Sequence, residues 1–271
     1  MKTTLSLLIG IGLAASCFAA GLPPAEKDAK AALEKSPRHG EMIDIAVPGS
    51  KTPLKSYIVY PERKDKAPVV IVIHEIFGLS DWVRSVADQL AADGFIAIAP
   101  DLLSGHGKDG GGTESLGGRD EVMKAIRGLK GDEVTAGLNA VRDYGIKQPA
   151  ANGKSASIGF CWGGGQSFAF GASQPELNAA VVYYGSPPPA DAMEKIKCPV
   201  MGHYGGNDAR ITATVEPTAA TMKKLGKTYL PNVHDGAGHG FLRAQDGTPA
   251  NLKAAQEAWP ATIKFLQENT K

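Results

Sequence analysis

The chain carries two kinds of hydrophobic pattern, and together they predict strands that alternate with helices. Residues 68–74 form an unbroken apolar run rich in Val and Ile, which is typical of a strand buried on both faces. Residues 81–93 place apolar side chains at helical spacing and end at a glycine. By the same criteria we expect strands at 41–47, 54–60, 95–99, 155–159, 179–184, 198–204 and 228–233, a glycine-rich loop at 104–118, helices at 162–173, 214–225 and 249–267, and two helices within 120–144 broken near 128–131.

This alternation continues from residue 68 onward without a linker-like break, which indicates a single α/β domain over residues 41–271. We expect a mostly parallel central sheet flanked by helices. The two leading strands are joined by the turn signal Pro48-Gly49-Ser50, so they predict an antiparallel N-terminal edge. Residues 21–40 form a lead-in segment, in which residues 26–35 are either a short helix or a flexible stretch.

The extreme N-terminus has the layout of a secretory signal peptide over residues 1–20. Lys2 precedes an apolar run over residues 5–15, and small residues follow up to Ala20. The run is shorter than the roughly 20 residues that a bilayer span needs, so we expect no membrane span. The sequence therefore predicts an exported, periplasmic protein; secretion from the cell and a lipid anchor on Cys17 are the alternatives.

Charge and cysteine content narrow the function classes. The 29 Lys and Arg residues nearly balance the 28 Asp and Glu residues, so we expect no nucleic-acid partner. There is no CxxC spacing or His/Cys cluster, so we expect no metal site. Three cysteines are present, and Cys17 leaves with the signal peptide. We expect Cys161 and Cys198 to remain thiols and the protein to be a monomer.

The segment from Gly159 to Gly164, GFCWGG, lies between a predicted strand and a predicted helix. It has the layout of a nucleophile elbow, with Cys161 at the position where serine is usual. A thiol there stands at a helix N-terminus, which favours the thiolate form. The alternative is a glycine-rich loop with an inert, buried cysteine.

Polar side chains follow two other predicted strands at the point where each ends. Asp208 follows one, and His239 follows the last strand of the predicted sheet. Nucleophile, acid and histidine thus occur in the α/β-hydrolase order. Cys161 would attack an acyl carbonyl, His239 would move the protons, and Asp208 would orient His239. Asp235, in the same loop as the histidine, is a competing acid.

An oxyanion hole completes this hypothesis. The backbone N–H of Trp162 directly follows the predicted nucleophile, and Ile76 lies in the first strand-to-helix loop. Both are placed to donate hydrogen bonds to a developing oxyanion.

Four segments together resemble the dienelactone hydrolase family, and the resemblance runs from about Met42 to the C-terminus. They are Glu75-Ile76-Phe77-Gly78, the GFCWGG elbow, Gly206-Asn207-Asp208 and Ala237-Gly238-His239-Gly240-Phe241. The resemblance implies an α/β-hydrolase fold and a cysteine-dependent enzyme that opens an enol-lactone without a cofactor. It also implies that Glu75 helps to remove the thiol proton once substrate binds; the alternatives for Glu75 are a partner for Arg84 and a carboxylate that orders its loop.

The same resemblance implies a pair of arginines that hold a substrate carboxylate. Arg243 matches one of them, four residues beyond His239, and Arg119 falls in the expected place for the other. A planar guanidinium suits this task because it can donate two parallel hydrogen bonds to a carboxylate. The alternative is two solvated surface arginines. We therefore expect a small, anionic lactone or ester as substrate; a broader esterase or thioesterase, or a binding protein that keeps the scaffold, are the rival functions.

Overall fold

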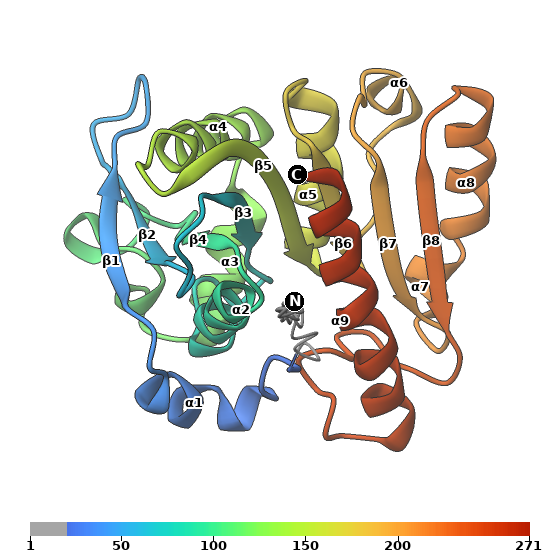
Figure 1. Cartoon of the computed structure of the whole chain (residues 1–271), viewed down its shortest axis with the longest axis horizontal. Coiled ribbons are helices and arrows are strands. Elements are labelled where there is room, and N and C mark those ends of the chain that lie inside the picture. The colour runs from blue at the N-terminus through green and yellow to red at the C-terminus, as the bar shows by residue number, and fades with distance from the viewer. Residues whose placement is uncertain (1–20) are drawn as a thin grey trace, which may run out of the picture.

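The computed structural model describes residues 21–271 (Figure 1). Eight strands form one sheet: β1 (Gly40–Ile45), β2 (Leu54–Val59), β3 (Ala67–Ile73), β4 (Ile96–Pro100), β5 (Ala151–Phe160), β6 (Ala179–Tyr183), β7 (Val200–Gly205) and β8 (Tyr229–His234). Their order across the sheet is β1-β2-β4-β3-β5-β6-β7-β8. The pairs from β4 to β8 are parallel, whereas β2 pairs antiparallel with β1 and with β4. The predicted fold, a parallel sheet with an antiparallel N-terminal edge, is confirmed.

The predicted helices are also present, with ends that differ by a few residues. They are α1 (Ala29–Lys35), α2 (Asp81–Ala92), α3 (Arg119–Gly128), α4 (Gly131–Ile146), α5 (Trp162–Ser173), α8 (Val215–Lys224) and α9 (Pro249–Asn269). The lead-in segment contains α1 and a preceding 3-10 turn, η1 (Glu26–Asp28). The glycine-rich loop contains two more 3-10 turns, η2 (Lys108–Gly110) and η3 (Thr113–Ser115). The predicted signal peptide lies outside the described residues.

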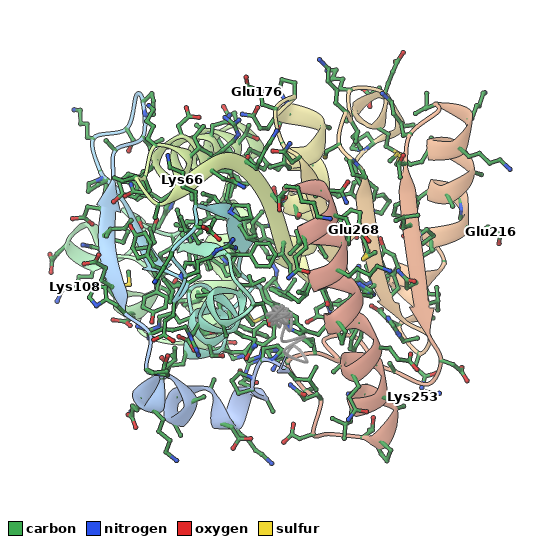
Figure 2. All side chains as sticks on the ribbon, viewed as in Figure 1. Lys66, Lys108, Glu176, Glu216, Lys253 and Glu268 are labelled. Atoms are coloured by element: carbon green, nitrogen blue, oxygen red, sulfur yellow. The ribbon has the colours of Figure 1, made fainter. Side chains whose placement is uncertain are left out.

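The helices cover both faces of the sheet. One core contains side chains of α1, α2 and α9, among them Trp82 and Trp259. The opposite core contains side chains of α4, α5 and α8, among them Leu138, Phe168 and Met222. Strand β3 is buried along its whole length, as its unbroken apolar run predicts. Apolar side chains fill the space between the sheet and the helices on each of its faces. The charged side chains labelled in Figure 2 project from the outside of the molecule.

Within residues 21–271, no helix combines the length and apolar character required to cross a membrane. Because β3, β5, β7 and β8 run parallel, their carboxyl ends meet at one edge of the sheet. The loops that follow them therefore converge there, and they carry the residues that the sequence singles out.

Candidate active site

Cys161 lies on a sharp turn between β5 and α5, with backbone angles φ 54° and ψ −115°. Few non-glycine residues adopt a positive φ, so the surroundings must hold this conformation in place. A Cβ atom at Gly159 would overlap the Gly163 carbonyl, and one at Gly163 would overlap the carbonyls of Ile73 and His74. Glycine at these two positions thus allows the turn to pack against β3 and its own helix. This is the elbow geometry that the sequence predicts.

His239 and Asp208 form a hydrogen-bonded pair beside this turn. The His239 Nδ1 and Asp208 Oδ2 atoms are 2.5 Å apart. The Asp208 carboxylate is nearly buried, whereas the His239 side chain is about one-third exposed. Asp208 Oδ2 accepts the Nδ1 proton, so the opposite ring nitrogen, Nε2, is the one free to exchange a proton with a ligand. The competing acid, Asp235, does not make this contact.

A cavity of about 510 Å³ joins the predicted catalytic groups. Its walls include Cys161 and His239, the two residues predicted to form the oxyanion hole, and an apolar side formed by Pro187–Pro189. Cys161 is partly exposed to it, whereas Cys198 is buried among apolar side chains on the other face of the sheet. A small ligand in this cavity would meet the thiol and the imidazole together.

Glu75 is the buried acid of the site. Its side chain is only 5% exposed, and its Oε2 lies 2.7 Å from Arg243 Nε. The Nε–H does not point along a hydrogen-bond direction, so the contact is an ion pair held by charge. Burial raises the pKa of Glu75 to about 7, and the charge of Arg243 opposes that rise. The carboxylate is thus in balance with its neutral form near neutral pH.

Burial also governs the Cys161 thiol. It raises the pKa of the thiol to about 11, and the charge of Glu75 adds to the rise. The backbone N–H of Trp162, at the start of α5, acts in the opposite direction. The helix N-terminus therefore favours the thiolate, as the sequence predicts, while burial acts in the opposite direction with the larger effect on the pKa. Within residues 21–271 no hydrogen bond joins the thiol to His239, and the raised pKa favours the protonated sulfur.

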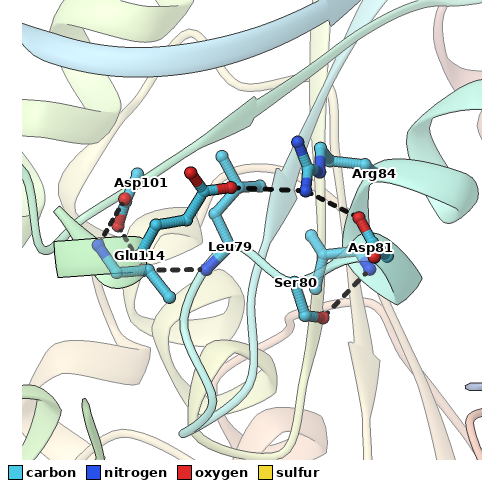
Figure 3. Close-up of polar contacts among 8 residues, drawn as sticks. Leu79, Ser80, Asp81, Arg84, Asp101 and Glu114 are labelled. Atoms are coloured by element: carbon cyan, nitrogen blue, oxygen red, sulfur yellow. Dashed lines mark hydrogen bonds and ion pairs between the residues drawn. The ribbon is translucent and has the colours of Figure 1, made fainter. Parts of the chain in front are cut away.

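The loop that carries Glu75 is held by neutral and charged contacts on both sides. His74 Nδ1 lies 2.8 Å from the Glu75 carbonyl, and its Nε2 accepts a hydrogen bond from the Leu102 N–H. Leu79 N–H donates to Thr113, which in turn bonds to Asp101 through its N–H and its hydroxyl. The contacts of Leu79 and Asp101 with Thr113 hold the β3–α2 loop against the glycine-rich loop (Figure 3).

Arg84 does not pair with Glu75. Figure 3 shows its guanidinium paired with Asp81 and Glu114. The two N–O distances are 2.6 Å and 3.5 Å. The alternative role for Glu75 as a partner of Arg84 is therefore wrong.

Phe77 brings the two predicted substrate-binding arginines near each other. The Arg119 guanidinium carbon lies 3.7 Å from the centre of the Phe77 ring, and that of Arg243 lies 5.1 Å from it. Arg119, at the start of α3, is exposed, whereas Arg243 is mostly covered. Neither belongs to the lining of the 510 Å³ cavity. They lie next to the catalytic groups rather than within their cavity.

Sequence reasoning missed two charged residues of the site. Arg210, in the short helix α7 (Ala209–Thr212), lines the cavity, and its charge lowers the pKa of Cys161. Its only sequence signal is its place two residues after Asp208. Glu26 pairs with Arg243 from 217 positions away along the chain, and no local pattern could have indicated that contact. Within residues 21–271 no cluster of side chains is suited to hold a metal ion.

Comparison with known proteins agrees with the resemblance. The model of the dienelactone hydrolase family matches residues 54–270. A carboxymethylenebutenolidase from a Pseudomonas species is 32% identical over 196 residues, which cover 70% of this chain and 79% of that protein. A Salmonella typhimurium protein assigned as a carboxymethylenebutenolidase is 30% identical over 210 residues, which cover 72% of this chain and 76% of that protein.

The solved structures give the same result. A crystal structure assigned as a dienelactone hydrolase from Klebsiella pneumoniae superimposes with a TM-score of 0.73 and 26% identity. The match covers 85% of this chain and 98% of that one. Fold, matched family and relatives agree, and the chain is therefore a carboxylic ester hydrolase that belongs to the dienelactone hydrolase family.

Proposed function

We propose that the protein hydrolyses a small lactone or ester of the dienelactone type through a thioester formed on Cys161. One observation carries this proposal: Cys161, on its elbow, shares a cavity with His239, which is hydrogen-bonded to Asp208. The family and the carboxymethylenebutenolidase relatives support the substrate class. This arrangement supplies a nucleophile, a proton carrier and an orienting acid in one place.

The proposed reaction has two halves. The Cys161 sulfur forms a bond to the ester carbonyl carbon, and the backbone N–H groups of Ile76 and Trp162 donate hydrogen bonds to the oxyanion. The C–O bond of the ester then breaks, and the leaving oxygen takes up the proton that Glu75 has removed from the thiol. In the second half, His239 removes a proton from water, which attacks the thioester. The products are a carboxylate and the free thiol.

Glu75 is the base that we propose for the first proton transfer. Its carboxylate is buried beside the thiol, and the pKa values of about 7 and about 11 keep the resting sulfur protonated. A substrate carboxylate bound at Arg243 would weaken the attraction between Arg243 and Glu75. The Glu75 carboxylate would then become a stronger base. Activation of the thiol would then depend on the ligand, which protects the resting enzyme from unwanted alkylation or oxidation.

A broader esterase is the second candidate function, and the cavity favours it. The apolar wall and the volume of about 510 Å³ leave room for an acyl or alcohol group larger than a small lactone. Arg119 and Arg243 lie outside the cavity lining, so a neutral ester could occupy it without contacting either arginine.

Arg119→Ala tests the carboxylate part of the proposal. We expect KM for a carboxylated lactone to rise about tenfold, the effect of one lost charge-assisted hydrogen bond at an exposed site. KM for a neutral ester of equal size should not change. Steady-state kinetics on the two substrates measure this. Arg119 is preferred to Arg243 here, because removing Arg243 would also leave Glu75 buried without its charged partner.

Arg127→Ala is the matched control, since Arg127 is an exposed arginine of the same helix. Equal KM values for Arg119→Ala and Arg127→Ala on the carboxylated substrate would overturn the carboxylate clamp. In that case the broader esterase would be the better description.

A further inference from the structure

Residues 21–40 precede the segment that matches the family, and they are attached to the loop that follows His239. The Gln245 side-chain amide donates to the Pro23 carbonyl at 2.7 Å, and the Glu26 N–H donates to the Arg243 carbonyl at 3.0 Å. Lys27 and Asp246 form an ion pair at 2.8 Å. Figure 1 shows this blue segment running from the loop before α9 to α1.

The rest of the segment is attached to α2. The Trp82 indole N–H donates to the Pro24 carbonyl at 3.1 Å. At the far end, Arg38 contacts both carboxylate oxygens of Asp88, at 2.5 and 3.0 Å. The Asp88 pair is largely covered, so it contributes more than an exposed ion pair would. Contacts at both ends thus hold Glu26 in a defined position.

The Glu26 carboxylate pairs with Nη1 of Arg243, while Glu75 lies against Nε of the same guanidinium. Glu75 is 5% exposed and Glu26 is 46% exposed, so Glu75 contacts the arginine from the interior and Glu26 from the solvent side. One guanidinium therefore already faces two carboxylates. A third carboxylate brought by a ligand would meet their repulsion as well as the attraction of Arg243.

We propose that Glu26 is a specificity-determining residue that occupies the solvent side of Arg243 and competes there with the carboxylate of an incoming substrate. This inference rests on the proposed function, because it assumes that Arg243 receives the substrate carboxylate. The Glu26 side chain is about half-exposed, so a carboxylated ligand can displace it at moderate cost. A neutral ester needs no displacement, and the lead-in segment thereby shifts the preference of the enzyme towards neutral substrates.

Glu26 also acts on Glu75 through the shared arginine. The charged and titratable groups that face Glu75 are Arg243, Glu26, Tyr184 and Cys161. Burial is the main cause of the raised pKa of Glu75, and the charge of Glu26 adds to it. Removing that charge should lower the pKa of Glu75, so the acid limb of kcat/KM should move to lower pH if Glu75 acts as the base.

Glu26→Gln tests the proposal, with Glu34→Gln as the matched control because Glu34 is an exposed glutamate of the same segment. The probes are N-ethylmaleimide and 3-maleimidopropionic acid, two thiol reagents that differ in a carboxylate. The rate of labelling at Cys161, followed by mass spectrometry, is compared for the two. Glu26→Gln should raise the ratio of carboxylated to neutral labelling about three- to tenfold, and Glu34→Gln should leave it unchanged.

Two kinetic measurements complete the test. Glu26→Gln should lower the KM of a carboxylated lactone, and it should move the acid limb of the pH profile of kcat/KM to lower pH. An unchanged labelling ratio and an unchanged KM would overturn the proposal and leave the segment a structural role. Arg243→Gln separates this failure from that of the proposed function. If Arg243→Gln reduces carboxylated labelling and Glu26→Gln does not raise it, only the role of Glu26 is wrong. If neither variant changes the ratio, Arg243 does not receive a carboxylate at all.

Discussion

Cys161→Ala is expected to lower kcat for ester and lactone hydrolysis by about 10⁴-fold or more. The substitution removes the sulfur that forms the acyl bond in the proposed reaction, and loss of a nucleophile leaves only the residual effects of binding and the oxyanion hole. The side chain is partly exposed on the turn after β5, so alanine should fit there without disturbing the core. Steady-state hydrolysis of a chromogenic ester, with thermal melting as a check on folding, measures the effect.

Cys198→Ala is the natural control for this experiment. Cys198 is the other free thiol in residues 21–271, and it is buried in the core on the far side of the sheet from α9. Its removal should leave kcat within about twofold of the wild type, at a small cost in stability. Full activity in Cys161→Ala, or a large loss confined to Cys198→Ala, would show that the wrong cysteine has been assigned.

Asp208→Asn is expected to reduce kcat by about 10² to 10⁴-fold, with little change in KM. Asp208 accepts the Nδ1 proton of His239 at 2.5 Å, and this contact leaves Nε2 unprotonated in the neutral ring. An asparagine can present its NH₂ group to Nδ1 instead, which would favour the opposite tautomer. The nitrogen facing the ligand would then carry a proton and could not act as a base.

Asp235→Asn provides the comparison, because Asp235 is an exposed carboxylate in the loop that leads to His239. It should retain kcat close to that of the wild type. A loss in Asp235→Asn as large as that in Asp208→Asn would contradict this explanation. The effect would then come from the loss of a negative charge near His239 or from a change in its loop, and not from the hydrogen bond to His239.

Much of the fold follows from patterns that are local in the sequence. The unbroken apolar run of β3 predicts a strand buried on both faces, and apolar residues at helical spacing predict helices with one buried face. Both kinds of element could therefore be predicted from the sequence. The helices α6 (Ala190–Met193) and α7 could not, since four residues are too few to display a helical period. Strand β5 begins four residues before the predicted start, where an irregular register with β3 adds Ala151 to the sheet.

The residues of the candidate site also differ in whether the sequence could predict them. Cys161, Asp208 and His239 could be found because each follows a parallel strand, and topology brings such positions to one edge. The two ion pairs of Arg243 could not be predicted from the sequence, because its partners Glu26 and Glu75 lie 217 and 168 positions earlier in the chain. The raised pKa of the thiol likewise depends on how deeply the folded chain buries it.

Detection of an acyl-enzyme would show whether Cys161 is the nucleophile. The wild-type protein would be mixed with an excess of a slowly hydrolysed activated ester, quenched in acid within seconds, digested and analysed by mass spectrometry. We expect a mass increase equal to the acyl group on the peptide that contains Cys161. Hydroxylamine should remove this group, and His239→Ala should prolong its lifetime. An acyl group found on another residue, or rapid turnover with Cys161 never modified, would contradict this role for Cys161.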